Sequence, residues 1–402
     1  MSDFTSSDAL ARIKPSPTIA VSQKARELKA KGEDVIALAA GEPDFPTPEH
    51  IADAGVKAIR DGKTGYTAVD GIPELKEAIA KKFSRENNLS YDPQTEIVAT
   101  SGGKYVIFAA MLATLNPGEE VIIPAPYWVS YPDIVKLCGG TPVTVQTQEE
   151  QAFRLQADAL EAAITPKTKW LFLNSPSNPT GGVLDEGDLK AIGEVLLRHP
   201  NVWVLTDDIY EHVIFDATFA TIASAVPDLK DRTLTMNGAS KAFSMTGWRM
   251  GYGAGPAPLM AAMRKLIGQS TSNPSSITQW ATVAALTGDQ SFLKARAEAF
   301  RERRDMLLDV FARIPGVTCA KPEGAFYLYP SLEGLIGGSI DGRTLETDID
   351  VCDALLEREK VALVPGTAFG KAPFARLSYA ASMESLEDAA ARITRFCEQV
   401  DR

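Results

Sequence analysis

Residues 237–252, Asn-Gly-Ala-Ser-Lys-Ala-Phe-Ser-Met-Thr-Gly-Trp-Arg-Met-Gly-Tyr, are the segment around which the chain is organised. Its single lysine, Lys241, stands among small and apolar residues, beside Ser240 and eight positions before Arg249. Burial disfavours a charged ammonium, so we expect the pKa of Lys241 to fall toward that of a usable amine nucleophile. Glycines of the stretch are expected to interrupt regular structure around it. A lysine amine close to a serine and an arginine that can bind a phosphate suggests a site where pyridoxal phosphate (PLP) forms a Schiff base. The alternative is a solvated loop lysine, as most lysines are.

Composition limits the classes of protein that the chain can represent. It has 402 residues, 45% of them hydrophobic, which is enough for two domains. The net charge of −11 and the lack of a basic run argue against a nucleic-acid partner. Four scattered cysteines and three histidines show no metal-ligand spacing, so no metal is expected. A polar N-terminus and no membrane-length apolar run predict a cytoplasmic protein that does not contact membranes.

Short apolar strands alternate with helices through the middle of the chain. This alternation predicts a mostly parallel α/β sheet with helices on both faces, whose functional side chains gather at the carboxyl ends of the strands. The expected strands are 97–100, 120–124, 141–145, 170–174, 203–206 and 233–236.

Candidate site residues follow several of these strands. Residues 174–182, 207–210 and 240–241 each come directly after a strand and supply Asn, Asp, Tyr, Ser and Lys side chains. Residues 101–103 place two glycines between a strand and a helix, where free backbone N–H groups can bind a phosphate. The Pro- and Gly-rich segment 41–48 is either a linker or a site loop, in which Gly41 lets a ligand approach the backbone.

The pattern changes after Gly288. A long charged helix over 291–314 is followed by short strands, a glycine-rich segment at 332–343 that we expect to be a surface loop, and a strand over 374–379. We therefore predict a large domain over 47–287 and a smaller α/β domain formed by 1–46 together with 288–402.

The chain resembles the class I PLP-dependent aminotransferases of fold type I, and looks most similar to the bacterial aspartate/prephenate aminotransferase subgroup. The resemblance spans nearly the whole chain. It implies a large domain with a mostly parallel seven-stranded sheet flanked by helices, a smaller α/β domain, and a homodimer with shared active sites. It is carried by the motifs at 14–18, 40–45, 71–75, 124–131, 174–181, 207–211, 240–252, 322–327 and 376–380.

By this resemblance, Lys241 forms the internal aldimine with PLP and later moves the proton between the substrate and the cofactor. Asp207 would pair with the pyridine nitrogen, which keeps the ring an electron sink. Tyr210 and Asn178 would donate hydrogen bonds to the ring oxygen, and Trp128 would stack on the ring.

The resemblance also implies how the phosphate is held. Gly103, the backbone amide of Lys104, Ser240 and Arg249 would bind it, and Tyr66 would reach the phosphate of the neighbouring subunit. Arg376 would clamp the substrate α-carboxylate through both guanidinium nitrogens. The residues that would complete the substrate site are Gly41, Trp128, Asn178, Thr18 and Lys104.

The expected reaction moves an amino group between an L-amino acid, aspartate or glutamate above all, and a 2-oxo acid by a ping-pong mechanism. Thr18 and Lys104 match residues that read acidic side chains in the subgroup, but a helix cap and a solvated lysine explain them equally well. Pro46 and residues 105–107 depart from the family's usual pattern. A transaminase for aromatic amino acids or prephenate, or a β-lyase, stays open as an alternative, whereas a PLP-binding transcriptional regulator and a cofactor-free descendant are less favoured.

Overall fold

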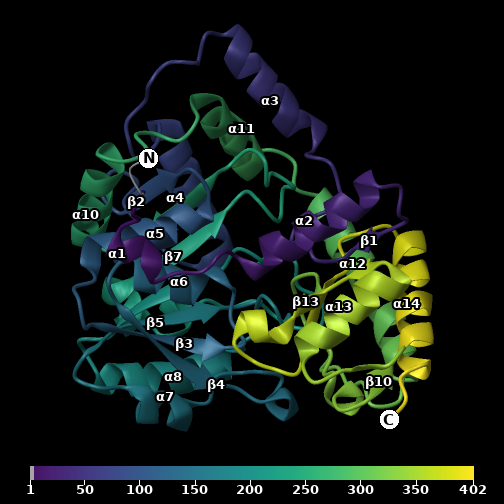
Figure 1. The fold of residues 1–402 in the computed structure, drawn as a ribbon. Coiled ribbons are helices and arrows are strands. Elements are labelled where there is room, and N and C mark those ends of the chain that lie inside the picture. The colour runs from purple at the N-terminus through teal and green to yellow at the C-terminus, as the bar shows by residue number, and fades with distance from the viewer. Residues whose placement is uncertain (1–3) are drawn as a thin grey trace.

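The computed structural model describes residues 4–402, and its largest element is a seven-stranded sheet (Figure 1). The strands run in the order β2-β8-β7-β6-β5-β3-β4. Only β8 is antiparallel to its neighbours β2 and β7, and all other pairs are parallel. The bounds are β2 Ile97–Thr100, β3 Glu120–Ala125, β4 Thr141–Gln146, β5 Thr168–Asn174, β6 Trp203–Asp207, β7 Thr233–Gly238 and β8 Gly251–Ala254. The predicted mostly parallel α/β fold is confirmed.

Helices cover both faces of this sheet, because alternate residues of each buried strand point to opposite faces. Val121 and Ile123 pack with α5, α6 and α10, whereas Ile122 packs on the other face with α7 and α8. Near β2 and β8 that second face is covered by α3, α4 and α11. The bounds are α3 Glu49–Arg60, α4 Pro73–Asn87, α5 Gly103–Thr114, α6 Ser130–Leu137, α7 Ala157–Ala163, α8 Glu186–Arg198, α9 Ile222–Ala225, α10 Ala257–Gly268 and α11 Ser276–Thr287.

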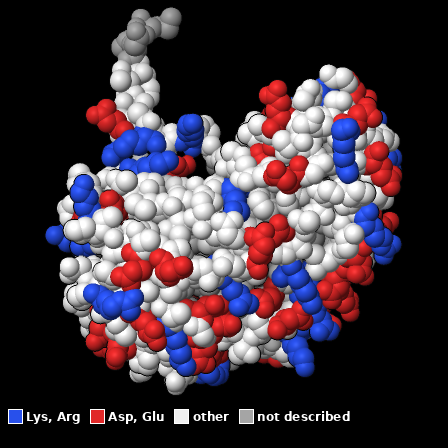
Figure 2. Space-filling view, turned by 90° about the horizontal axis from the view of Figure 1, so that it is seen from below, with Lys and Arg blue, Asp and Glu red and all other residues white. Residues whose placement is uncertain are grey.

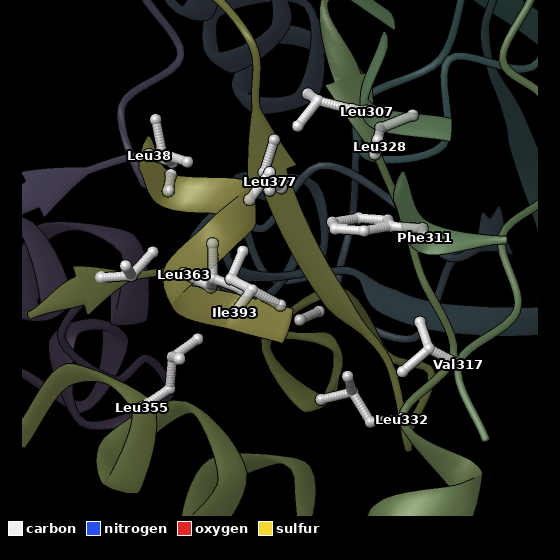
Figure 3. Close-up of a cluster of buried hydrophobic side chains, with 14 of the residues drawn as sticks. Leu38, Leu307, Phe311, Val317, Leu328, Leu332, Leu355, Leu363, Leu377 and Ile393 are labelled. Atoms are coloured by element: carbon white, nitrogen blue, oxygen red, sulfur yellow. The ribbon is translucent and has the colours of Figure 1, made fainter. Parts of the chain in front are cut away.

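The C-terminal part of the chain forms a second core beside the sheet. A three-stranded antiparallel sheet, β13-β14-β9, packs against α12, α13 and α14, and Figure 3 shows the leucines and Phe311 that fill the space between them. Strand β1 pairs with β12, and α2 packs beside both. The bounds are α1 Asp8–Ala11, α2 Pro17–Ala30, β1 Ile36–Ala37, α12 Phe292–Phe311, β9 Tyr327–Leu328, β10 Ser339–Ile340, β11 Arg343–Thr344, α13 Asp348–Glu359, β12 Val361–Ala362, β13 Val364–Pro365, β14 Ala375–Ser378 and α14 Met383–Glu398.

Two local expectations are wrong. Gly238 and Gly251 do not interrupt regular structure; they face each other as a pair of β7 and β8, because β8 lies too close to α5 for a side chain. Residues 332–343 are not a plain surface loop, since they hold the short β10–β11 hairpin and bury Leu335 and Ile340. The first three residues of the predicted 1–46 part of the smaller domain lie outside the described part of the chain.

The surface carries charges of both signs. Figure 2 shows lysines and arginines interspersed with acidic side chains over one face of the molecule. Within residues 4–402, no helix is both long enough and apolar enough to traverse a lipid bilayer.

Candidate active site

A cavity of about 390 Å³ opens at the carboxyl ends of β5, β6 and β7. Its wall brings together residues that are far apart in the sequence, from α2, the segment after β1, the start of α5 and strand β14. Every predicted site residue except Tyr66 lines it, namely Thr18, Gly41, Gly103, Lys104, Trp128, Asn178, Asp207, Tyr210, Ser240, Lys241, Arg249 and Arg376.

Strand register aligns the ends that carry these side chains. Asn174 pairs with Asp207, and Asp207 pairs with Met236, so β5 and β6 end at the same level and β7 ends two residues further on. Asn174 then links two turns, because its Nδ2 donates to the Asp207 carbonyl at 2.8 Å and its Oδ1 accepts from the Asn178 amide at 2.8 Å. The parallel sheet thereby fixes where Asp207 and Asn178 stand relative to each other.

Asp207 is a buried carboxylate at the floor of the cavity. Its Oδ2 accepts a hydrogen bond of 2.6 Å from the Tyr131 hydroxyl, and its Oδ1 accepts one of 3.3 Å from the Ile209 amide. Burial raises the pKa of Asp207 to about 6, although these two hydrogen bonds and the charge of Lys241 favour the ionised form. A cation placed against Asp207 would stabilise the carboxylate further.

Lys241 follows β7 and is partly buried. Its Nζ donates to the Gly41 carbonyl and lies 5.8 Å from the centroid of the Tyr210 ring. Burial, followed by the positive charge of Arg376, lowers the pKa of Lys241 to about 8, as the sequence predicts. An appreciable fraction of this amine is therefore neutral, and nucleophilic, close to neutral pH.

Arg376 on β14 is a buried cation with an unused donor. Its Nη1 donates to Asn178 Oδ1 at 2.9 Å and its Nη2 to the Ala39 carbonyl at 2.6 Å, while its Nε has no partner. The guanidinium carbon lies 4.6 Å from the centroid of the Tyr327 ring and 5.0 Å from that of the Phe369 ring. Among residues 4–402, Arg376 takes part in no salt bridge, and burial lowers its pKa, so an anion bound beside it would stabilise its charge.

A second positive corner forms where β8 meets the start of α5. A Cβ at Gly251 would lie 2.2 Å from the Gly103 nitrogen, and one at Gly102 would lie 2.4 Å from Nη2 of Arg249. The glycines thus let a guanidinium approach the N-terminus of a helix, with Ser240 nearby on the cavity wall. Free backbone N–H groups and a cation at a helix N-terminus suit an anion such as a phosphate.

The remaining wall is aromatic and polar. The hydroxyls of Tyr210 and Tyr327 are 2.7 Å apart, and the Lys104 ammonium lies 4.9 Å from the centroid of the Trp128 ring. Burial and then the charge of Arg249 lower the pKa of Lys104.

Two predicted residues need separate mention. Thr18 lines the cavity in the first turn of α2, and its buried hydroxyl has no hydrogen-bond partner, so it does not cap the helix. Tyr66 is 94% exposed on the segment between α3 and α4 and contributes nothing to the cavity of its own chain.

Two residues without a predicted role also belong to the site. Tyr131 holds the Asp207 carboxylate, and Tyr327 contacts both Tyr210 and the Arg376 guanidinium. Tyr327 also explains Gly41, because a Cβ there would lie 2.5 Å from the Tyr327 hydroxyl. Tyr131 and Tyr327 lie within the motifs 124–131 and 322–327, which could have marked them as site residues. The sequence does not show which side chain each of them contacts.

Comparisons with known proteins give one answer. The family model of the class I and II aminotransferases matches residues 33–393. The probable aspartate/prephenate aminotransferase of Rhizobium leguminosarum bv. phaseoli is 57% identical over 392 residues, which cover 97% of this chain and 98% of that protein.

Solved structures agree with the family model. The aspartate aminotransferase of Rhizobium meliloti superimposes with a TM-score of 0.96 at 49% identity, covering 99% of this chain and 100% of that one. The aspartate aminotransferase of Thermus thermophilus with maleate gives a TM-score of 0.91 at 42% identity, covering 98% and 100%. The chain therefore belongs to the class I and II aminotransferase family, and it is a transaminase of fold type I.

Proposed function

We propose that the protein is a PLP-dependent aminotransferase that moves an amino group between an L-amino acid, aspartate or glutamate first, and a 2-oxo acid. The observation that carries this proposal is one cavity holding both the Lys241 amine, with its pKa lowered to about 8, and the Arg376 guanidinium, with its Nε unpartnered. An amine nucleophile and a carboxylate receptor side by side suit an amino-acid substrate.

The residues present fit PLP at both ends. Arg249, Ser240 and the start of α5 at Gly103 form a corner of positive potential for the phosphate, and a Cβ at Gly102 would block it. The buried Asp207 carboxylate would face the ring nitrogen, where a positive charge offsets the burial that raises its pKa.

Four further residues would hold the ring. Trp128 offers an aromatic face for stacking. Tyr210 and Asn178 would donate to the ring oxygen, and Lys241 is the point of covalent attachment. We propose these roles from the placement of the side chains around one cavity.

When bound, PLP supplies an electron sink for the electron pair released from the substrate Cα–H bond. The chain supplies the base: Lys241 Nζ, as a neutral amine, accepts the proton from the substrate Cα. The Gly41 carbonyl, which already contacts Nζ, would orient it. Arg376 fixes the substrate by its α-carboxylate, so that the same hydrogen always faces the lysine.

Recognition of the substrate side chain is proposed for Thr18 and Lys104. Both line the cavity, and the unpartnered Thr18 hydroxyl can donate to a carboxylate that enters beside it. A relative's structure with maleate, a dicarboxylate, favours acidic substrates. Another relative is named a probable aspartate/prephenate aminotransferase, so we propose prephenate as a second candidate amino acceptor for this chain.

We also propose that the chain works as a homodimer in which Tyr66, exposed here, reaches the phosphate of the partner. The division into 47–287 and 1–46 with 288–402 is a further proposal, supported by the separate core around α12, α13 and α14. Movement of that smaller part would open and close the cavity.

The test is a half-reaction on the purified protein. Aspartate or glutamate alone should convert the visible absorbance of the bound cofactor to that of the pyridoxamine form, and borohydride should trap the cofactor on a peptide that contains Lys241. Lys241→Ala should lose nearly all turnover, on the order of 10⁴-fold or more. Normal turnover by that variant, or no uptake of PLP by the wild-type protein, would refute the proposal.

A further inference from the structure

A buried ion pair lies behind the cavity, on the far side of the turn that carries Asp207 and Tyr210. Lys82 of α4 contacts Glu211, and their side chains are only 1% and 4% exposed. Neither residue lines the cavity, and none of the roles proposed above uses them.

The Glu211 carboxylate also joins two elements by hydrogen bonds. Its Oε2 accepts from Asn87 Nδ2 at 2.9 Å, at the end of α4. Its Oε1 accepts from Asn237 Nδ2 at 2.7 Å, in β7. Lys82 completes the group by donating to Asn87 Oδ1 at 2.7 Å. One carboxylate therefore connects the turn after β6 to both a covering helix and the strand that leads into Lys241.

The position of this connection matters for two groups of the site. Glu211 is the neighbour of Tyr210, and Asn237 stands four positions before Lys241. The Tyr210 ring and Lys241 Nζ face each other at 5.8 Å across the cavity, although they come from different turns. The Asn237–Glu211 bond links the turn that carries Tyr210 to the strand that leads into Lys241.

Other ionisable side chains surround the pair. Glu86 and His212 flank the pair, with Lys82 Nζ 3.6 Å from Glu86 and His212 Nε2 3.1 Å from it. Burial is the largest cause of the lowered pKa of Lys241, and the charged groups that contribute most after it are Arg376, Glu42, Asp207 and Arg249. Glu211 acts on Lys241 through the Asn237 hydrogen bond, because Asn237 lies on the strand that leads into Lys241.

We propose that Glu211, neutralised by Lys82, is a positioning residue that sets Lys241 against Tyr210 through Asn237. The inference rests on the proposed function, since it concerns the placement of the groups that would hold PLP. An amide bonded to a buried carboxylate is among the stronger hydrogen bonds of a protein, and it has no water to replace it here.

The test compares two variants that each remove an amide donor from the same carboxylate. Asn237→Ala cuts the bond to β7, whereas the matched control Asn87→Ala cuts bonds to α4 and leaves the Asn237–Glu211 bond. The readouts are the thermal unfolding of the apoprotein and the midpoint pH of the visible spectrum of the PLP-loaded protein. Asn237→Ser replaces Asn237→Ala if the latter does not fold.

We expect both variants to unfold at lower temperature, but only Asn237→Ala to move the spectral midpoint upward, by at least about half a pH unit. The reason is that Tyr210 and Lys241 drift apart, which weakens the hydrogen bond from Tyr210 to the ring oxygen and lets water reach the amine. Equal midpoints in both variants and the wild-type protein, or equal shifts in both variants, would overturn the positioning role. A wild-type protein that binds no PLP would instead overturn the proposed function.

Discussion

At the scale of the residue, the site is a set of ionisable groups held away from their ordinary pKa values by burial. Lys241 and Asp207 are moved toward neutrality from opposite sides, to about 8 and about 6. In both cases burial in the low-dielectric interior is the largest cause, and it disfavours the charged form of each group. Such shifts gather where chemistry is carried out.

The lowered pKa of Lys241 predicts how the apoprotein captures PLP. Only the neutral amine attacks an aldehyde, so the second-order rate constant of capture should rise about tenfold per pH unit below pH 8 and level off above it. Stopped-flow absorbance between pH 6 and about 10 measures this. A rate that keeps rising to pH 10 would mean that the amine has the pKa of an ordinary exposed lysine.

The raised pKa of Asp207 predicts an effect on stability. The folded apoprotein holds this proton up to a pH of about 6, whereas an ordinary aspartic acid loses it near 3.8. The folded state therefore binds more protons between these values, so the free energy of unfolding falls as pH rises through that window and stays lower above it. Asp207→Asn should stabilise the apoprotein at pH 8 by up to about 3 kcal/mol, a gain that fades below pH 6.

Denaturant unfolding of the apoprotein at several pH values checks this prediction, with the exposed Asp231→Asn as the control for the loss of one negative charge. The same Asp207→Asn variant should bind and use PLP poorly. A variant that is less stable than the wild-type apoprotein at pH 8 would show that the carboxylate serves the fold, not the cofactor.

At the scale of the element, the close meeting of β8 with α5 builds the positive corner. Gly251→Ala would place a methyl group 2.2 Å from the Gly103 nitrogen, so the strand and the helix would have to separate. We expect a loss of about 1–3 kcal/mol in stability and a weaker affinity for PLP and for inorganic phosphate. Gly247→Ala is the matched control in the same segment, because no atom lies within 4 Å of its Cβ position. Calorimetry and phosphate titration measure these two effects. An equal loss in both variants would contradict the packing argument.

The same elements show what the sequence can predict. Strand β2 has the expected bounds, because it is a buried apolar run. Strand β8 was not expected: Gly251–Ala254 has two glycines and little apolar pattern, and it is a strand only because β2 and β7 pair with it on both sides. Its extended conformation is a property of the assembled sheet.

Some residues of the site could be predicted from the sequence and others could not. Lys241 and Asp207 were predictable because they lie at or soon after the ends of strands whose carboxyl ends meet at one edge. Tyr131 and Tyr327 were not, because each acts through a partner that is distant in sequence: 76 residues separate Tyr131 from Asp207, and 117 separate Tyr210 from Tyr327. Only the fold decides which tyrosine meets which partner.

At the scale of the whole molecule, the exposed Tyr66 tests the proposed shared sites. Mixed dimers of Lys241→Ala and Tyr66→Ala chains would contain one site with an intact lysine and an intact partner tyrosine. Random reassembly should then restore roughly a quarter of wild-type activity. Activity no higher than that of the separate variants would show that Tyr66 does not act across the interface.

The surroundings of Arg376 also determine which amines the site excludes. The Arg376 guanidinium is buried beside the Tyr327 and Phe369 rings, and its Nε has no hydrogen-bond partner, so the cation is desolvated before a substrate binds. A simple alkylamine has the amino group that reacts but no carboxylate, so the buried guanidinium would stay without a counter-ion. Discrimination against alkylamines therefore requires no steric clash, because the missing carboxylate alone weakens their binding.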